Sequence, residues 1–151
     1  MFGLKKKVYS VGTGICQSIT QAKDPVFREK MMGEGFLLMP SSGEVYAPVS
    51  GKIQTIFPTL HAISIELVDG SVVLIHMGIE TVSLKGQGFE VAVVQGTEVK
   101  ANSLLAKMDL QYIESQGLNT DIMVVFPESN RTIVNLKTDI VKHAEVIGLL
   151  K

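Results

Sequence analysis

Two histidines, His61 and His76, lie on the two sides of one predicted β-hairpin. Residues 59–66 and 73–79 are rich in apolar and β-branched side chains, and Asp69-Gly70 between them is a strong two-residue turn signal. A neutral imidazole offers a nitrogen lone pair that can act as a nucleophile, a proton acceptor or a metal ligand. The chemistry open to this chain therefore depends on whether the two rings meet.

The register of the hairpin predicts that they do meet. If Val68 pairs with Ser71, His61 is the diagonal neighbour of His76 on one face of the sheet. Apolar surroundings disfavour the charged imidazolium, and the ring nitrogen that does not react needs an acceptor to fix the tautomer. We expect Gly78 to supply that acceptor or to form a bulge that turns the ring outward. The residues predicted to share the face are all apolar: Ile63, directly opposite His76, and Ile65, Leu67, Val72 and Leu74.

The elements that position this hairpin are mostly short strands. Apolar residues recur with a period of two between frequent turn signals, which is typical of an all-β sandwich or barrel. Asp24 caps a predicted short helix over 25–32, and Asp109 caps another over 110–116. The predicted strands are 7–11, 14–19, 36–40, 44–47, 51–57, 61–68, 71–77, 81–84, 89–94, 103–108, 121–126, 132–136 and 145–150.

The composition indicates an ordinary globular protein. With 151 residues, of which 46% are hydrophobic and 19% charged, the chain can bury a sizeable core. A net charge of −1 argues against nucleic-acid binding, and no apolar run approaches the ~20 residues of a membrane span. Cys16 is the single cysteine, which fits a reducing compartment, and the N-terminus lacks the form of a secretory signal. We therefore expect a monomeric cytoplasmic protein.

No linker or change in composition divides the chain. We predict a single domain over residues 8–151, preceded by a tail formed by residues 1–7. The tail carries Lys5, Lys6 and Lys7 after its apolar residues. Each lysine contributes about 1 kcal/mol near anionic lipid, which is too little for stable anchoring, so we expect at most weak peripheral contact with a membrane.

Around the histidines the sequence resembles a known family, the glucose-type enzyme IIA of the bacterial phosphoenolpyruvate:sugar phosphotransferase system. The resemblance runs from about Val8 to the C-terminus, and residues 76–89 are its most specific part. The resemblance implies an antiparallel β-sandwich of the barrel-sandwich hybrid type, in agreement with the strand pattern. The matching stretches are residues 24–27, 31–35, 47–53, 57–62 and 76–89.

The resemblance also implies a phosphotransferase component in sugar transport that works through a phosphohistidine and requires no cofactor. In the family, the phosphocarrier HPr phosphorylates Nε2 of the histidine that corresponds to His76, which passes the phosphoryl group to a cysteine of the enzyme IIB domain of a sugar permease. His61 corresponds to the second active-site histidine, and Thr59 to the threonine that steadies it. Some relatives regulate other proteins, and in some the two histidines bind zinc together with a partner's carboxylate. His61 and His76 are therefore expected to bind metal only under that condition.

The chain departs from the family pattern at several positions. Glu34 and Glu80 stand where aspartates are usual, so the carboxylate is kept but its reach is longer. Asn102 occupies a turn position that is commonly glycine, and asparagine tolerates the left-handed conformation that such a turn needs. Met77 replaces a common aromatic residue beside His76.

Reversible docking of two unrelated partners calls for an apolar surface around the histidines. Methionine suits a surface that adapts to more than one partner. Asp24, Glu34 and Glu80 can add a negative potential that attracts a basic partner. The residues that we expect to form the apolar ring are Val26, Phe27, Met31, Met32, Phe57 and Val82.

Two other functions stay open at this point. A zinc-dependent hydrolase could use His61 and His76, although catalytic zinc usually has three protein ligands and no third His or Cys lies near them in the sequence. A biotinyl or lipoyl carrier module has a related sandwich with a modified lysine at a hairpin tip. The closest string to its motif is Lys107-Met108-Asp109, in the wrong sequence context.

Overall fold

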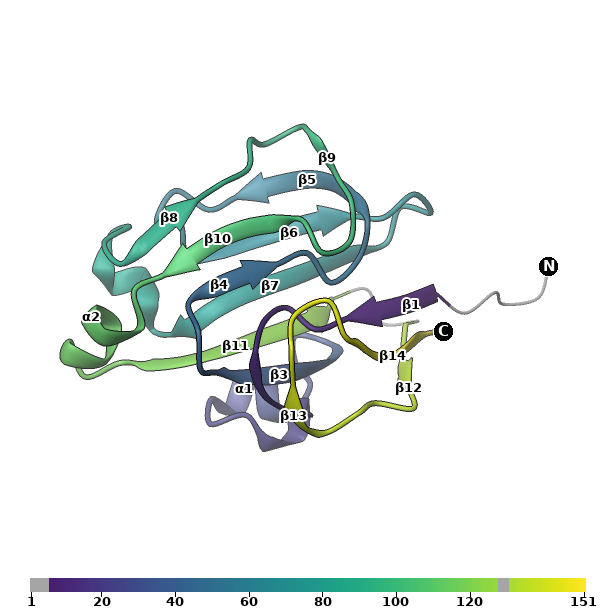
Figure 1. Cartoon of the computed structure of the whole chain (residues 1–151), viewed down its shortest axis with the longest axis horizontal. Coiled ribbons are helices and arrows are strands. Elements are labelled where there is room, and N and C mark those ends of the chain that lie inside the picture. Colours follow the sequence, from purple (N-terminus) through teal and green to yellow (C-terminus); the bar gives the residue numbers. More distant parts are fainter. Residues whose placement is uncertain (1–5, 128–130) are drawn as a thin grey trace.

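The computed structural model describes residues 6–127 and 131–151, which form short strands with brief helical turns between them (Figure 1). All strand pairs in this part of the chain are antiparallel. In chain order the elements are β1 (Lys6–Tyr9), β2 (Gly14–Ser18), η1 (Ile19–Gln21), α1 (Pro25–Arg28), β3 (Glu34–Pro40), β4 (Glu44–Tyr46), β5 (Gly51–Ile56), β6 (Ala62–Glu66), β7 (Val72–Ile79), η2 (Thr81–Leu84), β8 (Phe89–Val91), β9 (Glu98–Val99), β10 (Leu104–Met108), α2 (Leu110–Ser115), β11 (Asn119–Phe126), β12 (Ile133–Val134), β13 (Asp139–Val141) and β14 (Val146–Leu150).

The strands form one large sheet and two small ones. The eight-stranded sheet has the order β13-β2-β3-β11-β7-β6-β5-β9, and the three-stranded sheets have the orders β4-β10-β8 and β1-β14-β12. The main core joins the inner face of the large sheet to side chains of both small sheets, among them Val8, Val45 and Leu105. This arrangement confirms the predicted antiparallel β-sandwich.

A second apolar cluster covers the outer face of the large sheet. Its buried members come from η1 and the residue that follows it, from α1, and from strands β3, β6, β7 and β11: Ile19, Ala22, Phe27, Leu37, Ala62, Leu74, Met123 and Val125. Because successive side chains of a strand point to opposite faces, β11 supplies Ile122 and Val124 to the main core and Met123 and Val125 to the outer cluster. The histidine strands therefore have an apolar layer on each side.

The first helix ends earlier than predicted. Asp24 caps it as expected, since its Oδ1 accepts from the N–H of Val26 at 2.9 Å. Lys30 has φ 60°, and the N–H groups of Lys30 and Met31 donate to the carbonyls of Phe27 and Val26. These contacts form a Schellman motif, which stops the α-helix at Arg28 instead of continuing it to residue 32.

Other predicted elements differ in smaller ways. Residues 81–84 form a 3-10 turn, not a strand, because Glu80 before it and Lys85 after it both have left-handed backbones that reverse the chain. The second helix agrees with the prediction to within one residue at its end, over Leu110–Ser115 with Asp109 as its cap. The short elements η1, β9 and β13 were not predicted, because two or three residues carry too little pattern to detect.

The predicted register of the histidine hairpin is wrong by one residue. Ala62, not Ile63, lies opposite His76, and Ile63 pairs with Ile75. The loop contains three residues, 68–70, because the N–H of Leu67 donates to the carbonyl of Ser71 and Gly70 takes φ 88°. The predicted apolar face is consequently divided: Ile63, Ile65 and Leu67 belong to the main core, whereas Leu74 belongs to the outer cluster.

Candidate functional site

His76 lies on the outer face of β7, between Ala62 of β6 and Met123 of β11. Its Nδ1 is 2.8 Å from the carbonyl oxygen of Gly78, and a carbonyl can only accept. Nδ1 therefore carries the proton in the neutral ring, and Nε2 keeps a free lone pair. This contact confirms that Gly78 supplies the tautomer-fixing acceptor.

Gly78 can fill this role because it lacks a side chain. Its φ is 85°, and a Cβ there would lie 2.4 Å from Cγ2 of Thr81 and 2.9 Å from the carbonyl oxygen of Asn119. Thr81 is fully buried, and its hydroxyl donates to the carbonyl of Met77 at 2.6 Å. Thr81 thus holds the end of β7 in place where its pairing with β11 shifts register, next to His76. No spacing in the sequence indicated this role.

His61 lies next to His76 although it is not part of a regular strand. It precedes β6 and follows Leu60, whose φ is 61°, so the regular alternation of faces does not apply to it. The rings of His61 and His76 have centroids 5.1 Å apart and cross at 78°. The predicted meeting of the two rings is confirmed, although the register used to predict it is wrong.

Thr59 contacts His61 directly. Its Oγ1 lies 2.6 Å from Nδ1 of His61, and the N–H of Met77 donates to the carbonyl of His61 at 2.8 Å. His61 is 7% exposed, while His76 is partly buried. One side-chain contact and one main-chain contact therefore fix the position of His61 against β7.

Two phenylalanines flank the histidine pair. The ring of Phe27 in α1 lies 5.1 Å from that of His76, and the ring of Phe57 lies 5.6 Å from that of His61, both measured between centroids. The four rings form a continuous row. Aromatic edges and faces of this kind hold an imidazole in place without adding charge.

The surroundings favour the neutral form of both imidazoles. Burial lowers the pKa of His76, and the Gly78 carbonyl and the Asp24 carboxylate offset part of this effect. Burial also lowers the pKa of His61, and the neighbouring His76 lowers it further. Each ring therefore has a stronger preference for the uncharged form than free histidine.

The residues predicted to form the apolar ring differ in exposure. Met31, Val82 and Val26 are 73%, 51% and 42% exposed, as a docking surface requires. Met32 and Phe57 are partly buried against the outer cluster. Phe27 is only 5% exposed, so it supports His76 from below and offers little surface to a partner.

The acidic residues have different surroundings. Asp24 caps α1, and its carboxylate raises the pKa of His76. Glu34 forms an ion pair with Lys30 at 3.0 Å. Glu80 is exposed, with φ 61°, and its side chain makes no capping hydrogen bond.

One acidic residue near the site was not predicted. Asp121 of β11 is 6% exposed and lies 3.8 Å from Nζ of Lys23, on the stretch that leads into α1. Burial raises the pKa of its carboxyl group. In the sequence it reads as the first residue of a strand, and nothing there indicates that its side chain is enclosed.

The alternative functions find little support in the described residues. Within 6–127 and 131–151, no three His, Cys, Asp or Glu side chains gather as a metal site, so His61 and His76 have no third ligand there. Lys107 lies inside β10, paired with Glu44 on one side and Glu90 on the other, and not at a hairpin tip. No helix in these same ranges is long and apolar enough to cross a bilayer.

Comparison with known proteins points to one class, the sugar phosphotransferase proteins. The family model described as "phosphoenolpyruvate-dependent sugar phosphotransferase system, EIIA 1" matches residues 6–132. A solved structure of glucose permease IIA from Mycoplasma capricolum superposes with a TM-score of 0.93 at 35% identity, and the match covers 99% of this chain and 97% of that one. The fold therefore occurs in a known type of protein.

Curated relatives belong to the same class of protein. The glucose-specific EIIA component of Mycoplasma capricolum is 36% identical over 99% of this chain and 98% of its own length. That of Staphylococcus epidermidis is 40% identical over 83% of this chain and 76% of the relative. The glucose-specific EIICBA component of Streptococcus pneumoniae is 46% identical over 82% of this chain, which spans only 17% of that longer protein. The chain belongs to the glucose-type EIIA family of the sugar phosphotransferase system.

Proposed function

We propose that this chain is a phosphoryl carrier that takes its phosphoryl group from phosphorylated HPr onto Nε2 of His76. The observation that carries the proposal is the 2.8 Å contact between Nδ1 of His76 and the Gly78 carbonyl, which leaves the Nε2 lone pair free. As the new P–N bond forms on Nε2, the P–N bond to the donor histidine breaks. In the onward step, a cysteine thiolate of an enzyme IIB domain attacks the phosphorus, so that an S–P bond forms, the P–N bond to His76 breaks and Nε2 regains its lone pair.

His61 is proposed to stabilise the phosphoryl group in transfer. If the Thr59 hydroxyl donates to Nδ1 of His61 across their 2.6 Å contact, the proton of the neutral ring lies on Nε2. The His61 ring stands beside His76 and can then donate this N–H to a phosphoryl oxygen. Phosphoryl transfer depends mainly on alignment and on stabilising the charge of the oxygens, which this arrangement supplies.

The proposed partners are HPr and an enzyme IIB domain, and both would dock around the histidines. The exposed Val26, Met31 and Val82 give an apolar surface, and Asp24 and Glu80 add negative charge. The Streptococcus relative is named as an EIICBA component, with C, B and A in one chain, which supports an enzyme IIB partner. A zinc ion shared by His61 and His76 would need further ligands from a partner.

A reconstituted phosphorelay tests the function. The chain is incubated with phosphoenolpyruvate, enzyme I and HPr, and the acid-labile, base-stable phosphate is mapped by mass spectrometry. We expect one phosphate on His76, none in His76→Gln, and impaired transfer from His61→Gln to an enzyme IIB domain. Phosphate on another residue would refute the assignment of His76, and wild-type onward transfer by His61→Gln would refute the role of His61.

The same preparation separates the alternatives. Stoichiometric zinc in the purified protein would indicate a hydrolase, and an added mass on Lys107 would indicate an acyl carrier. We expect neither.

A further inference from the structure

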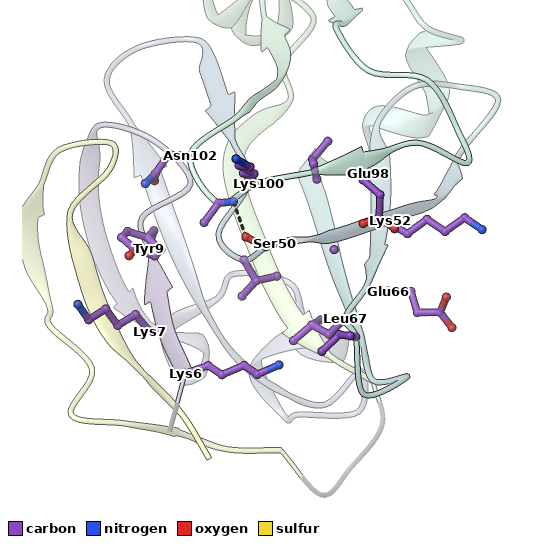
Figure 2. A pocket seen from close by; sticks show the side chains of 15 residues that line it. Lys6, Lys7, Tyr9, Ser50, Lys52, Glu66, Leu67, Glu98, Lys100 and Asn102 are labelled. Carbon is purple, nitrogen blue, oxygen red and sulfur yellow. Dashed lines mark hydrogen bonds between the residues drawn. The ribbon is translucent and has the colours of Figure 1, made fainter. Parts of the chain in front are cut away.

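A second concave site lies at the opposite end of the histidine hairpin. A cavity of about 1120 Å³ opens between β1 and the β5–β9 edge of the large sheet (Figure 2). Glu66 and Leu67, where β6 ends, line it, whereas His61 immediately precedes the start of that strand. At about 3.3 Å per residue, β6 separates the two sites by roughly 17 Å. The cavity therefore is not part of the histidine site.

The cavity collects lysines from segments that are distant in the sequence. Lys6 and Lys7 come from β1 and extend from it in opposite directions in Figure 2, while Lys52 comes from β5 and Lys100 follows β9. Within residues 6–127 and 131–151, no carboxylate lies within salt-bridge distance of these four; the ion pairs there are Lys23–Asp121, Lys30–Glu34, Arg131–Asp69 and Lys137–Glu145.

The charge of the cavity is therefore positive. Against the four ammonium groups stand two carboxylates in the lining, Glu66 and Glu98. The chain as a whole carries a net charge of −1, so the excess of positive charge is a local property of the cavity and not of the whole chain. Lys52 pairs with both glutamates across the neighbouring strands, so the excess of positive charge comes from Lys6, Lys7 and Lys100. A concave site with such an excess attracts an anionic ligand, and lysine is a common partner of phosphate.

Asn102 brings to the cavity a hydrogen-bond acceptor that has no partner. Its Oδ1 is shielded from solvent and has no hydrogen-bond partner, although the side chain lines the cavity. An acceptor left unpaired in this way is unfavourable. A half-turn of the amide about its last torsion exchanges Oδ1 with Nδ2 and can present the oxygen to a donor inside the cavity. A ligand hydroxyl is such a donor.

Ser50 supplies a second polar group to the same wall. Its Oγ accepts from the N–H of Ala101 at 2.9 Å, so its own O–H remains to be donated (Figure 2). Tyr9 lines the wall formed by β1, and Val49 and Leu67 give apolar surface. The cavity thus combines cations, hydroxyl partners and apolar walls, the mixture that small-molecule sites use for orientation.

We propose that this cavity binds a soluble phosphorylated polyol, with the phosphate held by the lysines and a hydroxyl held by Asn102 and Ser50. The binding is noncovalent. The lysines line a concave space and do not form a flat patch. This favours a small molecule that enters the cavity, and it disfavours a bilayer, which would only rest on the surface. The inference does not depend on His76 or on the proposed function.

Calorimetry on the full unphosphorylated chain tests the proposal with three probes: glucose 6-phosphate, glucose and inorganic phosphate. We expect glucose 6-phosphate to bind about tenfold more tightly than either fragment, because only it engages both groups. Amide signals in an NMR titration should move at residues 50, 67, 100 and 102. Binding to His76→Gln should be unchanged, which separates this result from the fate of the proposed function.

Asn102→Gly is the sharpest variant, since φ at this position is 73°, which glycine adopts without strain, so the turn is kept. We expect about three- to tenfold weaker binding of glucose 6-phosphate and unchanged binding of inorganic phosphate. Asn135→Gly is the matched control, because Asn135 has φ 57° and lies outside the cavity. It should bind like the wild type.

The lysines are tested as a pair. Lys7→Gln with Lys100→Gln removes one charge on β1 and one after β9 and should weaken glucose 6-phosphate by tenfold or more. Lys107→Gln, an exposed lysine of β10 outside the cavity, is the charge control and should have no effect.

Several outcomes would overturn the proposal. Equal affinity for inorganic phosphate and glucose 6-phosphate, with no effect of Asn102→Gly, would reduce the site to an unspecific cationic patch. Lysine-dependent binding to phosphatidylglycerol vesicles without binding of the soluble probes would assign it to a lipid headgroup. Failure of all probes to bind at millimolar concentration would refute it outright.

Discussion

The two faces of strands β6 and β7 differ in what fills them. On the inner face Ile63, Ile65, Ile75 and Met77 are completely buried in the main core. On the outer face β7 carries His76, partly buried, with only short elements above it. Because η1 and α1 cover the outer face incompletely, a polar ring there can keep one nitrogen bonded and the other reachable.

This difference shows how one hairpin can serve two purposes. The inner face gains free energy by removing apolar area from water, at about 25 cal/mol per Å². The outer face gives up some of that gain, because His61 and His76 occupy positions that apolar side chains would fill more favourably. The comparison predicts that changes to the inner face alter stability and that changes to the outer face alter chemistry.

The largest effect should come from His76→Gln. Phosphate acceptance should be lost completely, while the melting temperature stays within a few degrees of the wild type, since a similar volume and a polar group are kept. The phosphorelay assay measures phosphate acceptance, and a thermal melt measures the melting temperature. A large fall in melting temperature would show that the outer face also carries much of the stability.

Ile75→Ala tests the neighbouring inner-face residue. It should lower the free energy of unfolding by about 3–4 kcal/mol, because a fully buried side chain leaves a cavity. The folded fraction should still accept phosphate on His76. Denaturant unfolding gives the first value, and Ile75→Val, expected to cost about 1 kcal/mol, is the control. Loss of phosphate acceptance in fully folded protein would contradict the division between the faces.

Gly78→Ala should have the next largest effect. It should lower the free energy of unfolding by about 2–3 kcal/mol, because the new Cβ would meet Thr81 and the carbonyl of Asn119 in a left-handed backbone. Phosphate acceptance should also fall, since the carbonyl that fixes His76 would move. Gly70→Ala is the matched control: φ is 88°, no atom lies within 4 Å of the added Cβ, and only about 1 kcal/mol is expected. Equal costs at the two glycines would mean that packing at Gly78 is unimportant.

The histidine pair should make stability depend on pH. The pKa values of His61 and His76 are lowered in the folded chain, so below about pH 6.5 the unfolded chain binds protons that the folded chain does not. The free energy of unfolding should therefore be unaffected by these groups above pH 7 and should fall as the pH drops through 6.5. Urea unfolding at several pH values measures this, and His76→Gln should show a shallower fall.

The smallest effect concerns the coupling of the two rings. His76 lowers the pKa of His61, so His76→Gln should raise the pKa of His61 toward its ordinary value. An NMR titration of the ring signals gives the shift. An unchanged or lower pKa of His61 in the variant would show that burial alone accounts for its neutrality.

The sequence by itself determined the class of fold, the existence of the histidine hairpin and the caps of both short helices. These features depend on contacts between near neighbours or on the alternation of side chains along one strand, and both can be recognised without tertiary structure. Asp24 and Asp109 cap the residues that follow them, as predicted. The family resemblance, which also depends on local motifs, predicted the site residues.

Only the tertiary structure decided how the rings are presented. The three-residue loop at 68–70 shifted the register, and the left-handed Leu60 nevertheless brought His61 to His76. The enclosure of Asp121 beside Lys23, and the cavity lined by lysines and Asn102, depend on segments that are far apart in the chain. Their positions follow from how the sheets pack, and no local pattern of residues records that packing.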